Sequence, residues 1–280
     1  MDHVRIVVGF KVTPDYEALR PADWARVAAD DPEARAEATR YVRRVVNVFD
    51  EAALELALRL RDARAASGLR TSLAAFSVAG READPFLKTL QALGYEVARV
   101  EAGADLDFAP RVTAAVIAAH LRQAGLPDAL LLGSRCGPGE SGTVPFLLAD
   151  ELGLPCLTEV TDVETAAAGR LRVTFAAGGR PVRATIAPPC VLAVGNAVVS
   201  MLRVPTLKDR LAARERPFAV RPAADLGVDV AAALAGEPAA PAGLAAVDRS
   251  RAGVVVDGAT PAAKARALYE TGLRARLEEL

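Results

Sequence analysis

Short apolar segments alternate with segments that carry the apolar spacing of amphipathic helices, and this alternation constrains the fold more than any other feature. Ala53, Leu56, Ala57 and Leu60 recur at i, i+3, i+4 and i+7, a spacing that predicts a helix over residues 50–66. Strands that are joined through helices run in the same direction, because each helix returns the chain to the starting edge of the sheet. The alternation therefore predicts a Rossmann-like, doubly wound α/β fold with a mostly parallel sheet covered by helices on both faces.

The expected elements cover much of the chain up to residue 194. Strands are predicted at 4–8, 71–78, 96–100 and 129–132, and further helices at 84–93 and around 112–119. Beyond them, Gly178 and Gly179 lie between apolar segments at 171–176 and 182–186, which predicts a hairpin. Residues 190–194 form one more apolar strand.

The composition changes at about residue 219, where the chain becomes rich in alanine and proline and is typical of a linker. Near its end, Thr260 and Pro261 supply an N-cap and a first-turn proline for a helix that runs to Leu280. We therefore expect an α/β domain over residues 1–218 and a C-terminal extension over 219–280. The extension would be a linker and a helical arm that packs on a partner subunit or on the domain itself.

The strand expected at 129–132 leads directly into a glycine-rich loop and then into an apolar helix. In a parallel α/β sheet, such a junction exposes backbone N–H groups at the positive end of a helix, which favours phosphate. The glycines allow the backbone to approach that phosphate closely. The residues of this loop that we expect at a ligand are Gly133, Cys136, Glu140, Ser141, Gly142, Thr143 and Val144. The pattern is neither GxGxxG nor a Walker A loop, so it predicts a nucleotide site without naming the nucleotide.

Two other segments are candidates for the same site. Gly9 and Lys11 follow the first strand, where ligands bind in doubly wound sheets, although a simple turn with an exposed lysine explains them as well. Asn47 precedes the helix over 50–66 and has two interpretations: a helix cap paired with Asp50, or a contact to a ligand ribose or base. Cys136 has no histidine near it in sequence, so we interpret it as a small filling residue and not as a nucleophile.

Composition excludes several classes of function. A net charge of −1 argues against a general nucleic-acid binder, and three scattered cysteines are too few for a disulfide framework or a metal knuckle. The two histidines, His3 and His120, form no recognisable acid–base or metal pattern. Because no signal peptide and no membrane-spanning run is recognisable, we expect a cytoplasmic protein without membrane insertion.

Taken in order, several segments resemble the electron transfer flavoprotein beta subunit family. They are Lys11-Val12-Thr13-Pro14-Asp15 after the first strand, Asn47-Val48-Phe49-Asp50-Glu51 before the first long helix, Asp128-Ala129-Leu130-Leu131-Leu132-Gly133, Leu148-Ala149-Asp150-Glu151-Leu152-Gly153-Leu154-Pro155, and the segment from Pro205 to Phe218. The resemblance implies an adenine nucleotide alpha hydrolase-like fold. It also implies an electron carrier subunit that makes and breaks no bonds of its own.

The resemblance implies cofactors and partners as well. FAD would be shared with an alpha subunit, and the beta subunit itself would bind AMP or a second FAD. Electrons would come from acyl-CoA or other dehydrogenases and pass to a quinone reductase-type acceptor. Leu207 would be the docking residue that inserts into a partner dehydrogenase. The cofactor-binding residues implied outside the loop are Gly9, Asn47, Ser77 and Val78.

Some positions depart from the family pattern, and two other functions compete with this one. The Asn, Gln and Thr of AMP-type loops correspond here to Gly142, Thr143 and Val144, so that the loop is closer to the FAD-type pattern. Residues 17–45 are helix-like where the family has hairpin signals. The alternatives are an adenine-nucleotide-binding enzyme, such as an adenylating ligase, and a nucleotide-sensing module that works as a homodimer.

Overall fold

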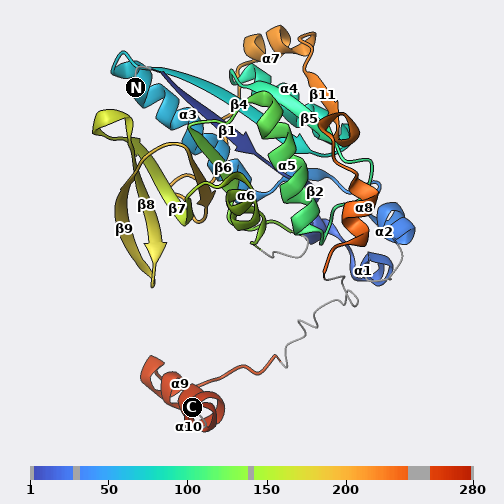
Figure 1. Cartoon of the computed structure of the whole chain (residues 1–280). Coiled ribbons are helices and arrows are strands. Elements are labelled where there is room, and N and C mark those ends of the chain that lie inside the picture. Colours follow the sequence, from blue (N-terminus) through green and yellow to red (C-terminus); the bar gives the residue numbers. More distant parts are fainter. Residues whose placement is uncertain (1–2, 28–31, 138–141, 239–252, 279–280) are drawn as a thin grey trace. The chain divides into compact units, whose positions relative to one another are not determined.

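The computed structural model describes residues 3–27, 32–137, 142–238 and 253–278, and the chain divides into two units, Met1–Leu244 and Ala245–Leu280. In the first unit, nine strands of the described residues form one sheet (Figure 1). Their order across the sheet is β11 (Ala219–Pro222), β5 (Glu96–Glu101), β4 (Arg70–Val78), β1 (His3–Gly9), β6 (Ala129–Gly133), β10 (Cys190–Val194), β7 (Cys156–Thr165), β8 (Leu171–Ala177) and β9 (Arg180–Ile186). From β11 to β7 neighbouring strands are parallel, and β8 and β9 continue the sheet antiparallel as the predicted hairpin.

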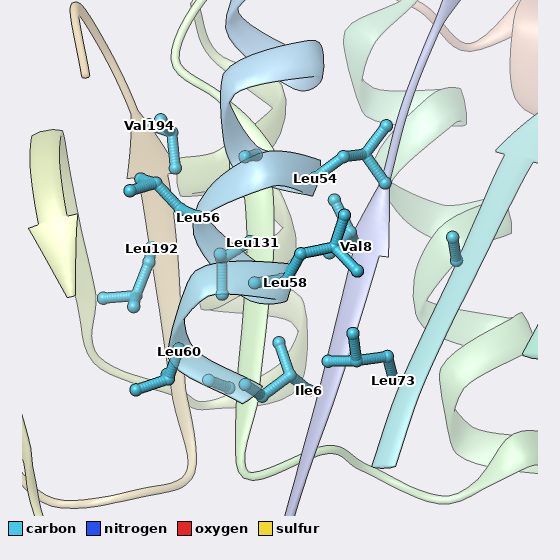
Figure 2. Packing of buried hydrophobic residues seen from close by; sticks show 14 of the residues in the cluster. Ile6, Val8, Leu54, Leu56, Leu58, Leu60, Leu73, Leu131, Leu192 and Val194 are labelled. Atoms are coloured by element: carbon cyan, nitrogen blue, oxygen red, sulfur yellow. The ribbon is translucent and has the colours of Figure 1, made fainter. Parts of the chain in front are cut away.

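Helices cover both faces of the sheet, as the alternation predicts. Successive residues of β1 point to opposite faces: Ile6 and Val8 pack in one core with α3 (Val48–Ala66) and α4 (Asp84–Ala92), and Val7 packs in the other with α5 (Pro110–Ala124) and α6 (Val144–Leu152). Figure 2 shows Leu54 and Leu58 of α3 lying over β1. The prediction of a doubly wound, mostly parallel α/β fold is confirmed.

The chain order creates a switch point between β1 and β6. Beyond β1 the sheet continues to β4 and β5, whereas beyond β6 it continues in the other direction to β10 and β7. In open α/β sheets, the connections that leave such neighbouring strands diverge and leave a crevice at their carboxyl ends. Gly9 and Gly133 are the last residues of the two strands, so both lie at this crevice.

The helix-like segment between the first strand and α3 folds mostly as helices. It contains a short 3₁₀ turn, η1 (Tyr16–Ala18), followed by α1 (Pro21–Val27) and α2 (Pro32–Thr39). Its last part forms β3 (Arg44–Val46), which pairs antiparallel with β2 (Val12–Pro14) in a separate two-stranded ribbon. The helices therefore replace part, but not all, of the hairpin that the family resemblance implies.

The linker-like composition beginning at residue 219 does not mark the end of the folded body. β11 forms the edge of the main sheet, paired in parallel with β5. After it, the turn η4 (Ala223–Leu226) and α8 (Val230–Ala235) pack on α5 through Ala223 and Val230. All four residues of β11 are exposed, so this strand lacks the apolar pattern that would have revealed it in the sequence.

The second unit consists of a helix that begins where the sequence predicts. Thr260 caps α9 (Pro261–Leu268) by accepting a hydrogen bond from the Ala263 N–H at 3.2 Å. A π-helical turn, η5 (Tyr269–Leu273), leads into α10 (Arg274–Glu278). In the described part of the chain, no helix is long and apolar enough to cross a membrane.

Candidate functional site: a cavity at the switch point

A cavity of ≈ 1070 Å³ lies at the carboxyl ends of β1, β4, β5 and β6. Of the residues predicted from the sequence, those that line it are Gly9, Val78, Gly133, Cys136, Thr143 and Val144. Ser77, Asn47 and Gly142 are not part of the lining. Glu140 and Ser141 lie outside the described residues. The structure therefore brings the strand ends and the start of α6 together around one cavity, although they are far apart along the chain.

The walls of this cavity are largely apolar and aromatic. Phe10, Phe76 and Phe108 contribute rings, and Leu132 and Ile117 contribute aliphatic surface. Apolar walls with a few polar groups are typical of cofactor sites, whose volumes are about 300–1,000 Å³. The volume of this cavity is slightly above that range, so the cavity has room for a ligand that carries more than one planar ring system.

The N-terminus of α6 supplies the polar end of the cavity. Thr143 precedes the first helical residue, Val144, and both line the cavity. The N–H groups of a first helical turn have no partner within the helix, and the helix dipole makes this end positive. Gly142 approaches it with φ of +62°, where a side chain would be strained, and an added Cβ would lie 3.1 Å from the Ser134 carbonyl oxygen. This end of the cavity can therefore receive a phosphate group.

Asp50 holds the two strand ends together, a role that sequence reasoning missed. Its carboxylate accepts a hydrogen bond from the Lys11 N–H at 2.9 Å and another from the Gly133 N–H at 2.6 Å. An added Cβ on Gly133 would lie only 2.5 Å from the Asp50 Oδ1, so only glycine allows this approach. Burial raises the pKa of Asp50 to about 6, while the two N–H donors oppose that shift.

Asn47 has a structural role that neither sequence interpretation described. It occupies the N-cap position of α3, but its side chain makes no capping bond, so the capping prediction is wrong. Its Nδ2 instead donates to the Arg135 carbonyl oxygen at 2.9 Å, which ties the loop after β6 to the start of α3. Asn47 and Asp50 therefore both fix loops that surround the cavity. The local sequence of this motif gives no signal of these partners, because they lie between 39 and 88 residues away in the sequence.

Ion pairs join the outer wall of the cavity. Lys11 Nζ lies 2.6 Å from Asp107 Oδ1, and Arg35 Nη2 lies 3.0 Å from Asp105 Oδ2. The Arg35 guanidinium also lies 5.9 Å from the centre of the Phe108 ring. These contacts connect α2 and the end of β1 to the loop between β5 and α5. Of the two interpretations of Lys11, a site residue or an exposed turn, the structure places it at the cavity. No pattern in the sequence indicated Arg35.

The remaining candidates lie away from the cavity or have ordinary explanations. Ser77 is fully buried on β4. His120 is buried against the Phe76 ring, with 5.1 Å between ring centres, and burial lowers its pKa to about 4. Within the described residues, no group of three or more acidic, histidine or cysteine side chains is arranged to hold a metal ion.

Apolar side chains are exposed on and before α7 (Leu207–Arg214). Leu207 is 73% exposed at the first position of this helix, so it is not a core residue. The other exposed apolar residues of this region are Val198, Met201, Val204 and Leu211. We call these five residues the docking surface. Lys208, Arg210 and Arg214 lie among them on the same exposed helix, so the apolar surface has a basic surround.

Together these features describe a doubly wound α/β protein in which a helix N-terminus lines a large apolar cavity at the switch point. Comparison with known proteins gives the family. A family model described as "Electron transfer flavoprotein domain" matches residues 37–226. The chain belongs to the electron transfer flavoprotein family, as the resemblance of its motifs implied.

Individual relatives agree with this assignment. "Putative electron transfer flavoprotein subunit YgcR" of Escherichia coli (strain K12) is 31% identical over 282 residues, covering 98% of this chain and 100% of that protein. "Electron transfer flavoprotein subunit beta" of Syntrophomonas wolfei is 28% identical over 64% of this chain and 68% of its own length. The protein of the same name in Bacillus subtilis is 30% identical over 43% of this chain and 45% of its own.

Proposed function

We propose that this chain is the beta-type subunit of a heterodimeric electron transfer flavoprotein and that its cavity binds an adenine nucleotide. The observation that carries the proposal is the cavity at the switch point, which combines a helix N-terminus with closely packed strand ends in a chain of this family. Two of its relatives are named as beta subunits. The phosphate would lie at residues 142–144, and the apolar walls near Gly9 and Val78 would enclose the rest of the nucleotide.

The dimensions of the cavity favour FAD over AMP as the nucleotide. Its volume of ≈ 1070 Å³ is slightly above the range for small-molecule sites, and its aromatic walls suit a second planar ring system. The Asn and Gln side chains that AMP-type loops carry are absent from 142–144. We therefore expect backbone N–H groups, and not side-chain amides, to hold the phosphates.

The partners follow from the same family assignment. FAD shared with an alpha subunit would carry the electrons, which would come from acyl-CoA or other dehydrogenases and pass to a quinone reductase-type acceptor. This chain's own residues would hold the nucleotide, exclude water from it and present the docking surface, in which Leu207 is the central apolar contact. The exposed side chains Leu268, Tyr269, Leu273 and Leu277 of the second unit would pack on the alpha subunit.

Co-purification tests this proposal directly. The full chain is expressed with an electron transfer flavoprotein alpha subunit encoded in the same genome, and the purified complex is heated to release its nucleotides for quantification. We expect a one-to-one heterodimer with flavin absorbance and two FAD per complex. One FAD with one AMP would retain the beta-type assignment and correct the ligand, whereas a complex without flavin, or no complex, would contradict the proposal.

A further inference from the structure

The docking surface begins in an irregular segment that is attached to α3 chiefly through one arginine, Arg203. Residues 195–206 contain no helix or strand, yet they carry the exposed Met201 and Val204. Between these two, Arg203 turns toward α3 and binds two of its carboxylates. The attachment therefore lies in the middle of the exposed apolar residues.

The contacts of Arg203 are numerous and partly buried. The Glu55 carboxylate, on a residue only 5% exposed, accepts from the Arg203 backbone N–H at 3.0 Å, from Nε at 3.0 Å and from Nη2 at 2.7 Å. Nη1 donates to Asp62 Oδ2 at 2.6 Å. Hydrogen bonds to these carboxylates raise the pKa of Arg203. A planar guanidinium that is held bidentately has its orientation fixed as well as its position.

A neighbouring backbone bond strengthens the attachment. The Leu202 N–H donates to Glu51 Oε1 at 3.0 Å, so two consecutive N–H groups of the segment are bound by carboxylates of α3. No strand pairing is available to satisfy these donors. Glu51 and Glu55 therefore take the place that a partner strand has elsewhere in the fold.

The other end of the docking surface is held by α4, which lies beside α7 (Figure 1). Lys88 donates to the carbonyl oxygens of Ala213 and Arg216, and Gln91 Nε2 donates to the Pro217 carbonyl oxygen at 3.0 Å. The surface is thus bound at two places, by Arg203 before α7 and by α4 after it. Between these two attachments, Val204, Leu207 and Leu211 remain exposed.

We propose that Arg203 is a positioning residue for docking: its pairing with Glu55 and Asp62 fixes where Met201, Val204 and Leu207 are presented to the partner dehydrogenase. This inference rests on the proposed docking function. Arg203 makes its contacts within the chain, so its effect on the partner is indirect. Loss of the pairing should weaken docking without loss of the fold.

Two variants separate positioning from general stability. Arg203→Lys keeps the charge but cannot form the planar bidentate pair. The double variant Arg203→Met, Glu55→Met removes both charges of the pair, so that no buried charge is left uncompensated, and the half-exposed Asp62 can be solvated. Arg210→Met is the matched control, because it removes a neighbouring exposed positive charge that has no attachment role.

Hydrogen–deuterium exchange of the full chain measures directly how firmly the segment around Arg203 is held. We expect the amides of residues 198–207 to exchange at least about tenfold faster in both Arg203 variants, with wild-type exchange in β1 and β6 and in the Arg210→Met control. Wild-type exchange over 198–207 in both variants would overturn the proposal, whether or not a partner is known.

Docking is measured as the rate at which an acyl-CoA dehydrogenase, supplied with its acyl-CoA substrate, reduces the heterodimer. We expect the Arg203 variants and Leu207→Ala to raise the KM for the heterodimer by at least about tenfold, with little change in kcat. If Leu207→Ala raises KM and the Arg203 variants do not, the positioning role of Arg203 is refuted, while the docking role of Leu207 stands. If Leu207→Ala has no effect, or the enzyme does not reduce the wild-type heterodimer, the docking function fails, and the exchange experiment still decides whether Arg203 fixes the segment.

Discussion

The cavity and the docking surface are built in opposite ways, although both depend on α3. In the cavity, the Asp50 carboxylate binds backbone N–H groups of two strand ends, and the polar seat is the backbone at the start of α6. At the docking surface, the Glu55 carboxylate binds the side chain and the backbone of Arg203, and the contacts offered to a partner are exposed apolar side chains. In the cavity, a ligand would thus contact backbone N–H groups, which makes it a backbone site. At the docking surface, a partner would contact exposed side chains on and before α7, which makes it a side-chain site.

Because the two sites are built differently, different substitutions should affect nucleotide binding and docking. A backbone site is sensitive to changes in the groups that fix its loops, and it tolerates many changes in the residues that face the ligand. An exposed side-chain site loses function when a displayed residue is shortened, at little cost in stability. Because the two sites share a helix but no described residue, their functions should separate cleanly.

The largest effect is expected at Asp50. Asp50→Ala would leave the N–H groups of Lys11 and Gly133 without their acceptor in a buried place, which costs about 2–6 kcal/mol for two such groups. Asp50→Asn keeps one acceptor oxygen and should lose roughly half as much. Urea denaturation measures both. An Asp50→Ala free energy of unfolding within about 1 kcal/mol of the wild type would show that the carboxylate does not hold the strand ends.

Asp50 should also leave a signature in the pH dependence of stability. Its pKa is raised to about 6 in the folded chain, from the ordinary value of 3.8 for an aspartate, so the folded state binds more protons between these values. The contribution is present below about pH 4 and is lost as the pH rises through 6, by up to about 3 kcal/mol. His120, with its pKa lowered to about 4, acts in the opposite direction, since its contribution is lost as the pH falls from about 6.5.

The difference between the wild type and Asp50→Asn isolates the carboxyl from His120, because both chains keep the histidine. We expect the stability of the wild type relative to the variant to fall between pH 4 and pH 6.5, as measured by urea denaturation at each pH. A relative stability that rises over this interval would mean that the N–H donors outweigh burial and that the pKa of Asp50 is lowered.

A smaller and more specific effect is expected at the start of α6. Thr143 makes no side-chain capping bond and Asp is a favoured N-cap residue, so Thr143→Asp should leave the helix start intact. Its charge within about 5 Å of a bound phosphate costs about 3 kcal/mol at an effective dielectric constant of about 20. We expect FAD or AMP to bind the full chain about 100-fold more weakly in calorimetric titrations. Thr143→Asn has the same shape without the charge and serves as the control. Equal affinities for the two variants would place the phosphate elsewhere.

The smallest effect on the molecule itself is expected at Leu207. Because its side chain is 73% exposed, Leu207→Ala should change the free energy of unfolding by less than about 0.5 kcal/mol. Nucleotide affinity should also be unchanged, while docking to a dehydrogenase weakens by about tenfold. A loss of nucleotide affinity in this variant would show that the cavity and the docking surface are coupled, contrary to the separation argued above.

The sequence predicted the fold, and it predicted part of the cavity lining, because the sheet and its strand ends follow from local patterns. Alternating apolar segments indicate the sheet and its helices, and the carboxyl ends of parallel strands meet at one edge, so Gly9 and Gly133 could be placed together without coordinates. Leu207 could be assigned to the surface from its basic neighbours and its resemblance to the family. The sheet and its strand ends need only the periodicity and order of the chain, whereas Val78 and Leu207 rest on the resemblance to the family.

The sequence did not reveal contacts that depend on packing between distant segments. Asp50 and Asn47 read as a local helix cap, whereas their partners are the loops after β1 and β6. Likewise, nothing in 219–222 marks an edge strand, because its exposed residues carry no apolar alternation. Such features are fixed by tertiary contacts that override the local signal.

The central claim is that an adenine nucleotide binds in the cavity with its phosphate at the N-terminus of α6. The most direct test is an experimental structure of the purified heterodimer with its natural nucleotides bound. We expect nucleotide density within this cavity, with phosphate oxygens within hydrogen-bond distance of the backbone N–H groups of residues 142–144. Density for a nucleotide bound to this chain elsewhere, with the cavity filled by its own side chains or by water, would contradict it.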